Sequence, residues 1–169
     1  MVLNVEEFSK KYKVRVLKAD DVDGIVSLCS KNKQYYKYCP PLVTHESIQA
    51  DMKALPPDKD YSDKYYVGYF DGDKLIAVLD LIMAYPNEKT AFVGFFMTDV
   101  SGQNKGMGSS LVSELGDYLH GIGVKSIRLG WVDGNPQAEH FWLKNGFAPT
   151  GVKYDTDNYT VVVAQKDIR

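Results

Sequence analysis

The segment QNKGMGSSLVSEL, residues 103–115, joins a predicted strand to a predicted helix through two glycines. The preceding run TAFVGFFMTDV, residues 90–100, is apolar, β-branched and aromatic, which is typical of a buried strand. Apolar residues then recur at helical spacing and predict one buried helix face: Met107, Leu111, Leu115, Leu119 and Ile122. Glycines before a helix let the backbone approach a ligand closely, and the unpaired N–H groups of the first turn attract anions. The segment therefore predicts a turn that binds a phosphate group.

The spacing of the glycines excludes two common nucleotide sites. A P-loop places a lysine and a hydroxyl residue directly after its last glycine, but here Met107 and Ser109 follow the two glycines and Lys105 precedes them. A dinucleotide-binding turn needs a third glycine where this chain has Leu111. The pyrophosphate of another ligand remains as the expected guest, and so does a glycine-rich turn that binds nothing.

Composition favours one compact domain over residues 1–169. A chain of 169 residues with 44% hydrophobic residues can bury a sizeable core. The net charge of −2 argues against a nucleic-acid partner. No apolar run approaches the roughly 20 residues that span a bilayer, so we expect no membrane partner and a cytoplasmic location. The two cysteines and three histidines show no metal-ligand spacing, so we expect no metal.

The hydrophobic period changes along the chain and predicts a mixed α/β (α+β) fold. The N-terminal part predicts a strand, a helix, an irregular segment and a second helix, at residues 14–17, 19–32, 34–41 and 45–55. The middle predicts an antiparallel meander at residues 64–70, 75–85 and 90–100. The helix of the glycine segment is followed by a strand, a helix and two final strands, at residues 126–132, 136–145 and 152–165. The apolar final strand, residues 160–164, could pair across a homodimer, although a monomer is equally compatible with the sequence.

Two motifs in this order resemble the GCN5-related N-acetyltransferase (GNAT) superfamily over nearly the whole chain. They are Gln103-x-x-Gly106-x-Gly108 after an apolar strand, and NPQAEHFWLKNGF at residues 135–147. The resemblance implies a mostly antiparallel twisted sheet of about seven strands flanked by about four helices. It also implies an N-acetyltransferase that uses acetyl-CoA as co-substrate. The acceptor would be a primary amine, on a small molecule or a peptide, attacking the thioester directly in a ternary complex.

The resemblance also assigns residues to the binding of coenzyme A. The loop would hold the pyrophosphate through Gln103, Asn104, Lys105, Gly106, Met107, Gly108 and Ser109. The strand end Phe96, Met97 and Thr98 would pair with the pantetheine arm, and a backbone N–H at Met97 or a direct neighbour would polarise the thioester carbonyl. The far side would be lined by Asn135, Ala138 and Phe141, with Lys144 near the phosphates. For Phe141 and Lys144 a purely structural role stays open.

The catalytic acid departs from the family pattern. Where members commonly carry a tyrosine, this chain has Trp142, and an indole N–H donates a hydrogen bond but releases no proton at useful pH. Either the thiolate leaves with help from water or another tyrosine, with Tyr154 and Tyr66 as candidates, or the chain is a slow or inactive acyl-CoA-binding module. A different acyl group also stays open.

The catalytic base and the acceptor wall are less clearly marked. The strand AFVGFFM, residues 91–97, has no carboxylate, whereas Asp80 lies among apolar residues and must be paired, protonated or facing a cavity. Asp99 and Glu139 are weaker candidates for the base. An acceptor wall is predicted in the segment 34–41, where aromatic rings suit cationic or aromatic amines or simply pack on the surface: Tyr35, Tyr36 and Tyr38.

Overall fold

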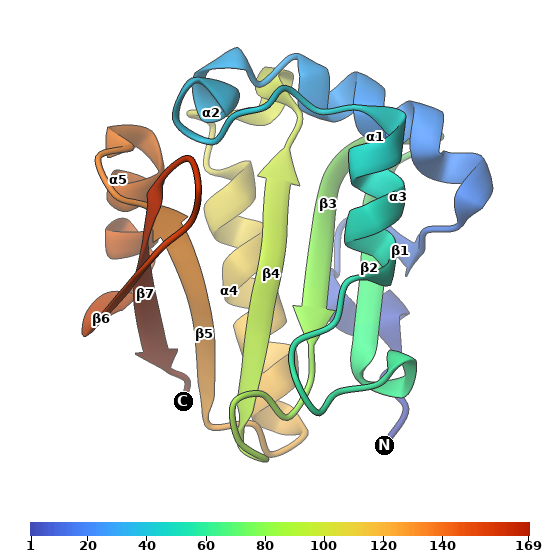
Figure 1. The fold of residues 1–169 in the computed structure, drawn as a ribbon. Coiled ribbons are helices and arrows are strands. Elements are labelled where there is room, and N and C mark those ends of the chain that lie inside the picture. Colours follow the sequence, from blue (N-terminus) through green and yellow to red (C-terminus); the bar gives the residue numbers. More distant parts are fainter.

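The computed structural model describes all residues, 1–169, and contains a seven-stranded mixed sheet in the order β1-β2-β3-β4-β5-β7-β6 (Figure 1). The strands are β1 Lys13–Val16, β2 Lys64–Asp71, β3 Lys74–Ile82, β4 Thr90–Thr98, β5 Ser126–Val132, β6 Ala148–Asp155 and β7 Thr160–Asp167. Every neighbouring pair is antiparallel except β4 and β5, which run parallel. The predicted meander β2-β3-β4 and the mixed, mostly antiparallel sheet are confirmed.

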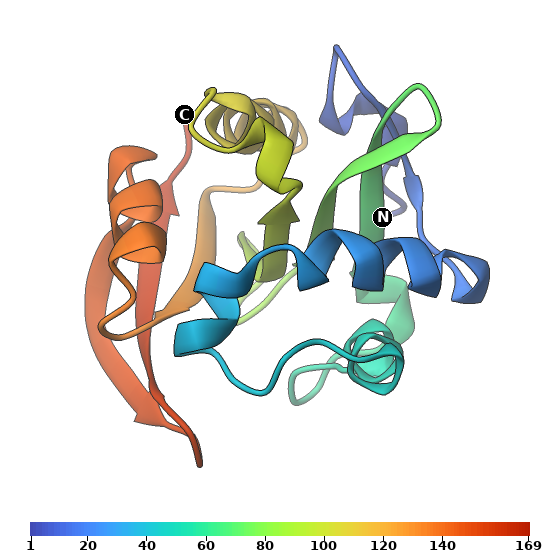
Figure 2. The same ribbon diagram turned by 90° about the horizontal axis from the view of Figure 1, so that it is seen from above.

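Five α-helices cover the two faces of the sheet: α1 Val22–Ser30, α2 Lys33–Tyr38, α3 His45–Lys53, α4 Met107–Gly121 and α5 Pro136–Lys144. Short 3-10 turns add Val5–Phe8, Ala19–Asp21, Tyr61–Asp63 and Val100–Gly102. Viewed from above, α1 to α3 lie on one face of the sheet and α4 on the other (Figure 2). None of the helices is both long and apolar enough to span a bilayer.

Helix α2 corrects the sequence-based expectation of an irregular segment at residues 34–41. The prolines at 40 and 41 forbid a helix only from the residue before them onward, and α2 ends at Tyr38 with Cys39 as its C-cap. The following helix, α3, begins as expected. Thr44 and Ser47 form a reciprocal capping box, in which the Thr44 side chain accepts from the Ser47 backbone N–H.

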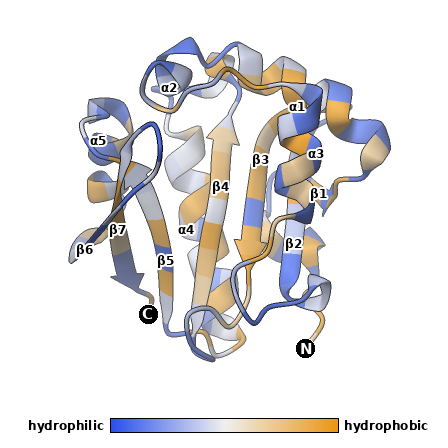
Figure 3. Ribbon diagram, in the orientation of Figure 1, coloured by the Kyte–Doolittle hydropathy of each residue, from blue (hydrophilic) through white to orange (hydrophobic).

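Two hydrophobic cores lie on opposite faces of the sheet. On one face the α4 stripe of Leu111, Leu115 and Leu119 is fully buried and packs with Trp142 and Phe147 around α5. On the other face α1 and α3 pack their apolar sides against β2, β3 and β4. The central strands β3 and β4 are accordingly the most hydrophobic part of the sheet (Figure 3).

Strands β4 and β5 pair over a short stretch and then separate. Thr90 to Phe92 face Ser126 to Arg128, and the hydroxyls of Thr90 and Ser126 lie 2.8 Å apart at this closed end. Beyond it β4 stays paired with β3, while β5 stays paired with β7 along its whole length. The sheet therefore opens as a wedge toward the N-terminus of α4.

A β-bulge at Gly94 shifts the side-chain alternation of β4. Asp80 on β3 pairs with Phe95 whereas the next residue, Leu81, pairs with Val93, so Gly94 has no partner. Regular alternation from Val93 would put Met97 on the α4 face and Phe96 on the α1 face. The extra residue reverses this, so Phe96 lies on the α4 face and Met97 on the α1 face. The aromatic run of β4 is thereby divided between the two cores.

The final strand is not available for pairing across a dimer. β7 lies between β5 and β6, and both of its edges are hydrogen-bonded within the chain. The edge strands are β1 and β6. The possible dimer contact through residues 160–164 is therefore excluded.

Candidate functional site

Three cavities meet around the ends of β4 and α2. The first, which we name the loop cleft, has a volume of about 260 Å³ and lies between the loop before α4, the end of β4 and helix α5. The second, the strand wedge, occupies about 230 Å³ between β4 and β5. The third, the acidic cavity, occupies about 490 Å³ beneath α2 and the α2–α3 segment. Tyr35 lines all three, so they adjoin one another, and we call the three together the branched space.

The loop before α4 presents free backbone N–H groups. Asn104 and Gly106 both have positive φ, 61° and 80°, and Gly106 is the N-cap of α4. From Asn104 through Ser109 no backbone N–H donates a hydrogen bond to another group of the protein. Adjacent free N–H groups at the positive end of a long helix form an anion-binding site. The phosphate-binding turn predicted from the sequence therefore has the required geometry.

The two glycines of the turn are required for different reasons. A Cβ on Gly106 would meet open space, so this position is a glycine because of its left-handed backbone. A Cβ on Gly108 would lie 3.0 Å from the Phe141 ring, which stacks on Phe96 at a centroid distance of 6.2 Å. Gly108 therefore lets α4 approach α5 across the loop cleft.

The loop cleft gathers twelve of the fourteen residues expected around coenzyme A. Its lining includes Phe96, Met97, Thr98, Gln103, Asn104, Gly106, Gly108, Ser109, Asn135, Ala138, Phe141 and Lys144. The side chains of Lys105 and Met107 lie outside it. Lys105 points to solvent, and Met107 packs beneath Gly102 against the α4 core. The Met107 side chain is thus partly buried against the core, while its backbone N–H stays among the free groups of the loop.

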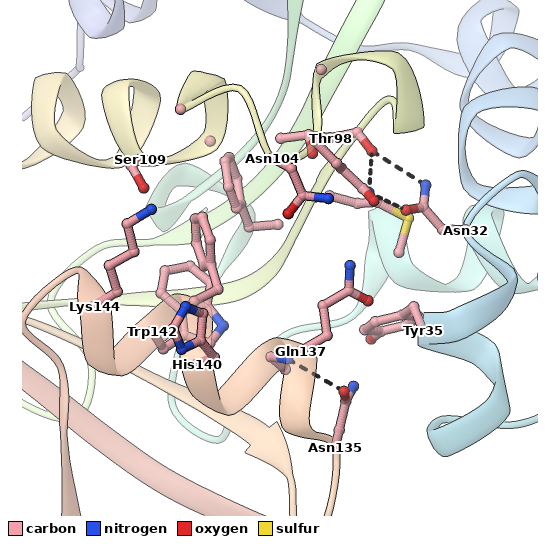
Figure 4. A pocket seen from close by; sticks show the side chains of 18 residues that line it. Asn32, Tyr35, Thr98, Asn104, Ser109, Asn135, Gln137, His140, Trp142 and Lys144 are labelled. Carbon is pink, nitrogen blue, oxygen red and sulfur yellow. Dashed lines mark hydrogen bonds between the residues drawn. The ribbon is translucent and has the colours of Figure 1, made fainter.

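Asn32 is a residue of the loop cleft that the sequence motifs do not reveal. It is 7% exposed, and its amide donates to the carbonyls of Leu28 and Thr98, both at 3.2 Å. Its side-chain oxygen accepts from Gln103, whose amide also approaches the Thr98 carbonyl (Figure 4). The junction of α1 and α2 is thus tied to the end of β4 and to the loop. Only these long-range contacts mark Asn32, since no local pattern does.

Two further asparagines fix helix α5 beside the loop cleft. Asn135 caps the helix by accepting from the Ala138 N–H, at 3.3 Å. Asn145 at its other end donates to the Ser109 hydroxyl at 3.1 Å. Between them Gln137 and His140, which the sequence analysis did not single out, join Lys144 on the lining (Figure 4).

The backbone of β4 turns one N–H toward the strand wedge near the position expected from the sequence. The Asp99 N–H donates to the Ile76 carbonyl on β3 at 2.8 Å. Antiparallel alternation along the β3–β4 register then directs the Met97 N–H toward β3 and the Phe96 N–H away from it. Because β5 has already separated, Phe96 has no strand partner on that side. The geometry favours Phe96 over Met97 for the carbonyl-polarising N–H.

Asp80 lines the acidic cavity and is paired with Lys64. The Lys64 ammonium lies 3.0 Å from each carboxylate oxygen and donates its hydrogen bond to Oδ2, while Oδ1 is buried and accepts no hydrogen bond. Burial raises the pKa of Asp80, and the neighbouring Lys64 opposes part of this rise. A Cβ on Gly94 would lie 2.7 Å from Oδ2. The bulge glycine therefore leaves the carboxylate uncovered on the side of β4.

Aromatic side chains form much of the remaining wall. Tyr35 and Tyr36 line the acidic cavity, and Tyr35 packs edge-on against Phe95 at a centroid distance of 6.3 Å. Tyr38, the third tyrosine of the predicted wall, lines none of the three cavities. Tyr159 from the turn between β6 and β7 lines both the acidic cavity and the strand wedge.

The candidates for the catalytic acid occupy different environments. Trp142 is 9% exposed and packs with Phe141 and Phe147 at centroid distances of 4.8 and 5.1 Å, with one edge on the loop cleft. Tyr154 lines the strand wedge and is 52% exposed. Tyr66 is buried on β2 and lines none of the three cavities.

The weaker candidates for the base lie outside the three cavities. Asp99 is buried at the start of a 3-10 turn, where its carboxylate accepts from the backbone and hydroxyl of Ser101 and lies near Lys31 and Lys74. These hydrogen bonds and lysines outweigh burial and lower its pKa. Glu139 is exposed on α5. No group of three or more His, Cys, Asp or Glu side chains is arranged to hold a metal ion.

The ends of the branched space have opposite electrostatic character. The loop cleft is lined by free N–H groups, Lys144 and His140, and by no Asp or Glu. The acidic cavity is lined by Asp51 and Asp80, and by no Lys, Arg or His. The strand wedge lies between these two ends and adjoins both.

Comparison with known proteins gives one family. The model of the acetyltransferase (GNAT) family matches residues 30–147. No curated protein sequence matches the chain. An acetyltransferase from Thermus thermophilus shares 18% identity and a TM-score of 0.75, over 94% of this chain and 97% of that chain.

Two similar structures contain ligands. PaiA N-acetyltransferase from Thermoplasma acidophilum, in complex with coenzyme A, has 18% identity and a TM-score of 0.64, over 92% of this chain and 98% of that chain. Spermidine N-acetyltransferase from Vibrio cholerae, in complex with CoA and spermine, has 19% identity and a TM-score of 0.67, over 95% of this chain and 97% of that chain. Identities this low show a shared fold.

The Asn32 contacts predict a measurable contribution to stability. Replacing Asn32 with alanine leaves the Thr98 carbonyl and the Gln103 amide without their buried partner, which costs about 1–3 kcal/mol. Urea denaturation should show this loss, and hydrogen exchange should become faster at the Gly102 and Gln103 amides of the loop. Asn158→Ala, at an exposed turn, is the matched control and should change stability by less than about 0.5 kcal/mol. Equal stability of the two variants would contradict the assignment.

Proposed function

Because this chain belongs to the acetyltransferase (GNAT) family, we propose that it transfers an acetyl group from acetyl-CoA to a primary amine. The observation that carries the proposal is the branched space. Its amide-rich loop cleft suits the anionic end of coenzyme A, its acidic cavity suits an ammonium group, and the strand wedge joins the two. One domain, residues 1–169, would perform the whole reaction; its cytoplasmic location and its oligomeric state stay predictions.

The donor would lie along the loop cleft and the strand wedge. The free N–H groups of residues 104–109 bind the pyrophosphate, with Lys144 and His140 adding positive charge on the opposite side. The pantetheine arm follows the unpaired edge of β4 in place of the strand that has separated. The Phe96 N–H then donates to the thioester oxygen and stabilises the negative charge that develops there.

Asp80 would accept the proton of the attacking amine. A lysine-like amine with a pKa of about 10.4 is almost fully protonated at neutral pH, so it needs a base before it can attack. Oδ2 of Asp80 lies on the side left uncovered by Gly94 and is the acceptor, and the raised pKa of this carboxylate strengthens it as a base. Asp80 first takes one proton from the bound ammonium, directly or through a water molecule. The neutral amine nitrogen then attacks the thioester carbon, the carbon–sulfur bond breaks, and the second proton lost by the nitrogen passes through solvent to the departing thiolate.

The leaving thiolate needs little help from a protein acid. A thiol has a pKa of about 8.5, so its anion is a good leaving group near neutral pH. Trp142 fills the position of the family's usual tyrosine as part of the aromatic core. Tyr154, which reaches the strand wedge, is the remaining protein donor, and solvent is the alternative. The substitution at Trp142 therefore does not by itself favour an inactive acyl-CoA-binding module.

A charge placed at the loop tests the donor site. Gly106→Glu adds a carboxylate where the pyrophosphate would bind, and we expect affinity for coenzyme A to fall at least about tenfold by isothermal calorimetry. Gly123→Glu is the matched control, since Gly123 also has positive φ and open space but lies beyond the other end of α4. Both variants should lose a similar ~1–2 kcal/mol from left-handed strain. Unchanged affinity in Gly106→Glu would contradict the donor site.

Removal of the carboxylate tests the base. Asp80→Asn should lower kcat/KM about 100-fold or more, because general bases contribute about 10²–10⁴-fold. A base works when deprotonated, so the wild-type rate should rise with pH through the pKa of Asp80, which burial places above its ordinary value. The variant should lose this rise. A pH–rate profile of thiol release would measure both effects.

A double variant separates catalysis from folding. Asp80→Asn leaves the buried Lys64 ammonium without its counter-charge, which destabilises the protein. Combining it with Lys64→Met removes both charges and should restore much of the melting temperature while activity stays low. A double variant that regains more than about half of the wild-type kcat/KM would contradict the role of Asp80.

A further inference from the structure

The walls of the acidic cavity carry information on the acceptor beyond its being an amine. Five aromatic residues line it: Tyr35, Tyr36, Phe92, Phe95 and Tyr159. Prolines and aliphatic side chains complete most of the wall, including Pro40, Pro41 and Ile82. Such a surface gains free energy by covering an apolar or aromatic group and by cation–π contact with an ammonium.

The charges around the cavity suit one ammonium group. Asp51 lies at the solvent side of the cavity, where burial nonetheless raises its pKa, and Asp80 lies deep in the wall. The Lys64 ammonium, 4% exposed, faces Asp80 and opposes part of the rise in the pKa of both carboxyl groups. Two carboxylates and one ammonium leave a single negative charge to be neutralised. A monoamine matches this charge, whereas a polyamine with three charges would leave two of them without a carboxylate among the lining residues.

Residues from two distant segments lie where the acidic cavity adjoins the strand wedge. They are Tyr159, in the turn between β6 and β7, and Cys39, the C-cap of α2. Both residues line the acidic cavity and the strand wedge. The β6–β7 turn and the end of α2 thus both contribute to the wall at this point, and Tyr159 adds an aromatic ring to it.

We infer that the acceptor is a small arylalkylamine, a molecule with one primary amine on an aromatic body. The aromatic body lies between Tyr36, Phe92 and Tyr159, and the ammonium faces Asp80 through the gap left by Gly94. This inference rests on the proposed acetyl transfer and adds the chemical class of its acceptor.

Competing amines test the inference with wild-type protein. Thiol release from acetyl-CoA is measured with 2-phenylethylamine, n-butylamine, spermidine and a hexapeptide with a free N-terminal alanine. We expect kcat/KM for 2-phenylethylamine to exceed that for each of the others by at least about tenfold. A preference for spermidine or the peptide overturns the inference and leaves the proposed acetyl transfer intact. Equal kcat/KM values for n-butylamine and 2-phenylethylamine overturn the inference that the acceptor carries an aromatic body.

A binding measurement covers the case in which no amine is acetylated. That result would contradict the proposed transfer, but calorimetric titration of 2-phenylethylamine into the protein saturated with coenzyme A still reports on the cavity. Saturable binding that spermidine does not compete for supports the arylalkylamine site. Absence of binding, or tighter binding of spermidine, overturns it.

A tyrosine variant assigns the effect to the cavity wall. Tyr36→Leu should raise KM for 2-phenylethylamine several-fold and leave KM for acetyl-CoA unchanged, because Tyr36 lines the acidic cavity but neither the loop cleft nor the strand wedge. Tyr61→Leu, at a tyrosine that is 62% exposed and lines none of the three cavities, is the control and should change neither constant. An unchanged KM for the amine in Tyr36→Leu would overturn the placement of the aromatic body.

Discussion

The early separation of β4 from β5 is the constraint on which the rest of the structure depends. Two parallel strands that stayed paired would satisfy each other's backbone groups and leave no room between them. Here each strand keeps its other neighbour, β3 or β7, so the sheet stays intact while the inner edges open. The hydroxyl pair of Thr90 and Ser126 holds the closed end. The open end provides both a cavity and an unpaired strand edge, which are what an extended ligand needs.

The single bulge residue Gly94 adjusts this frame in two ways. By adding one residue to β4 it reverses the side-chain alternation, so Phe96 joins the α4 core and Met97 joins the α1 core. By lacking a side chain it leaves Asp80 uncovered on the side of β4, where both residues line the acidic cavity. A side chain at position 94 would fill the space between the Asp80 carboxylate and the backbone of β4. Backbone geometry and proposed chemistry thus depend on the same glycine.

The sequence predicted those parts of the molecule that local patterns determine. The α4 stripe, the start of helix α3 and the meander follow from residues near one another in the chain, and all three appear in the structure. Helix α2 was missed because its aromatic residues resemble a loop beside two prolines. Asn32, the packing of Met107 under Gly102 and the contact of Gly108 with Phe141 depend on residues far apart in sequence. No periodicity or motif can reveal contacts of that kind.

In the proposed reaction, the absence of a carboxylate from β4 and the presence of one in apolar β3 have a single explanation. Strand β4 contains no carboxylate, and an isolated carboxylate lies in apolar β3. The register places Asp80 beside the β4 bulge, so the base would act across β4 through the space at Gly94. This arrangement keeps the carboxylate away from the loop, where a negative charge would oppose an anionic donor. It also surrounds Asp80 with aromatic and apolar groups, and the resulting burial raises the pKa that a proton acceptor requires.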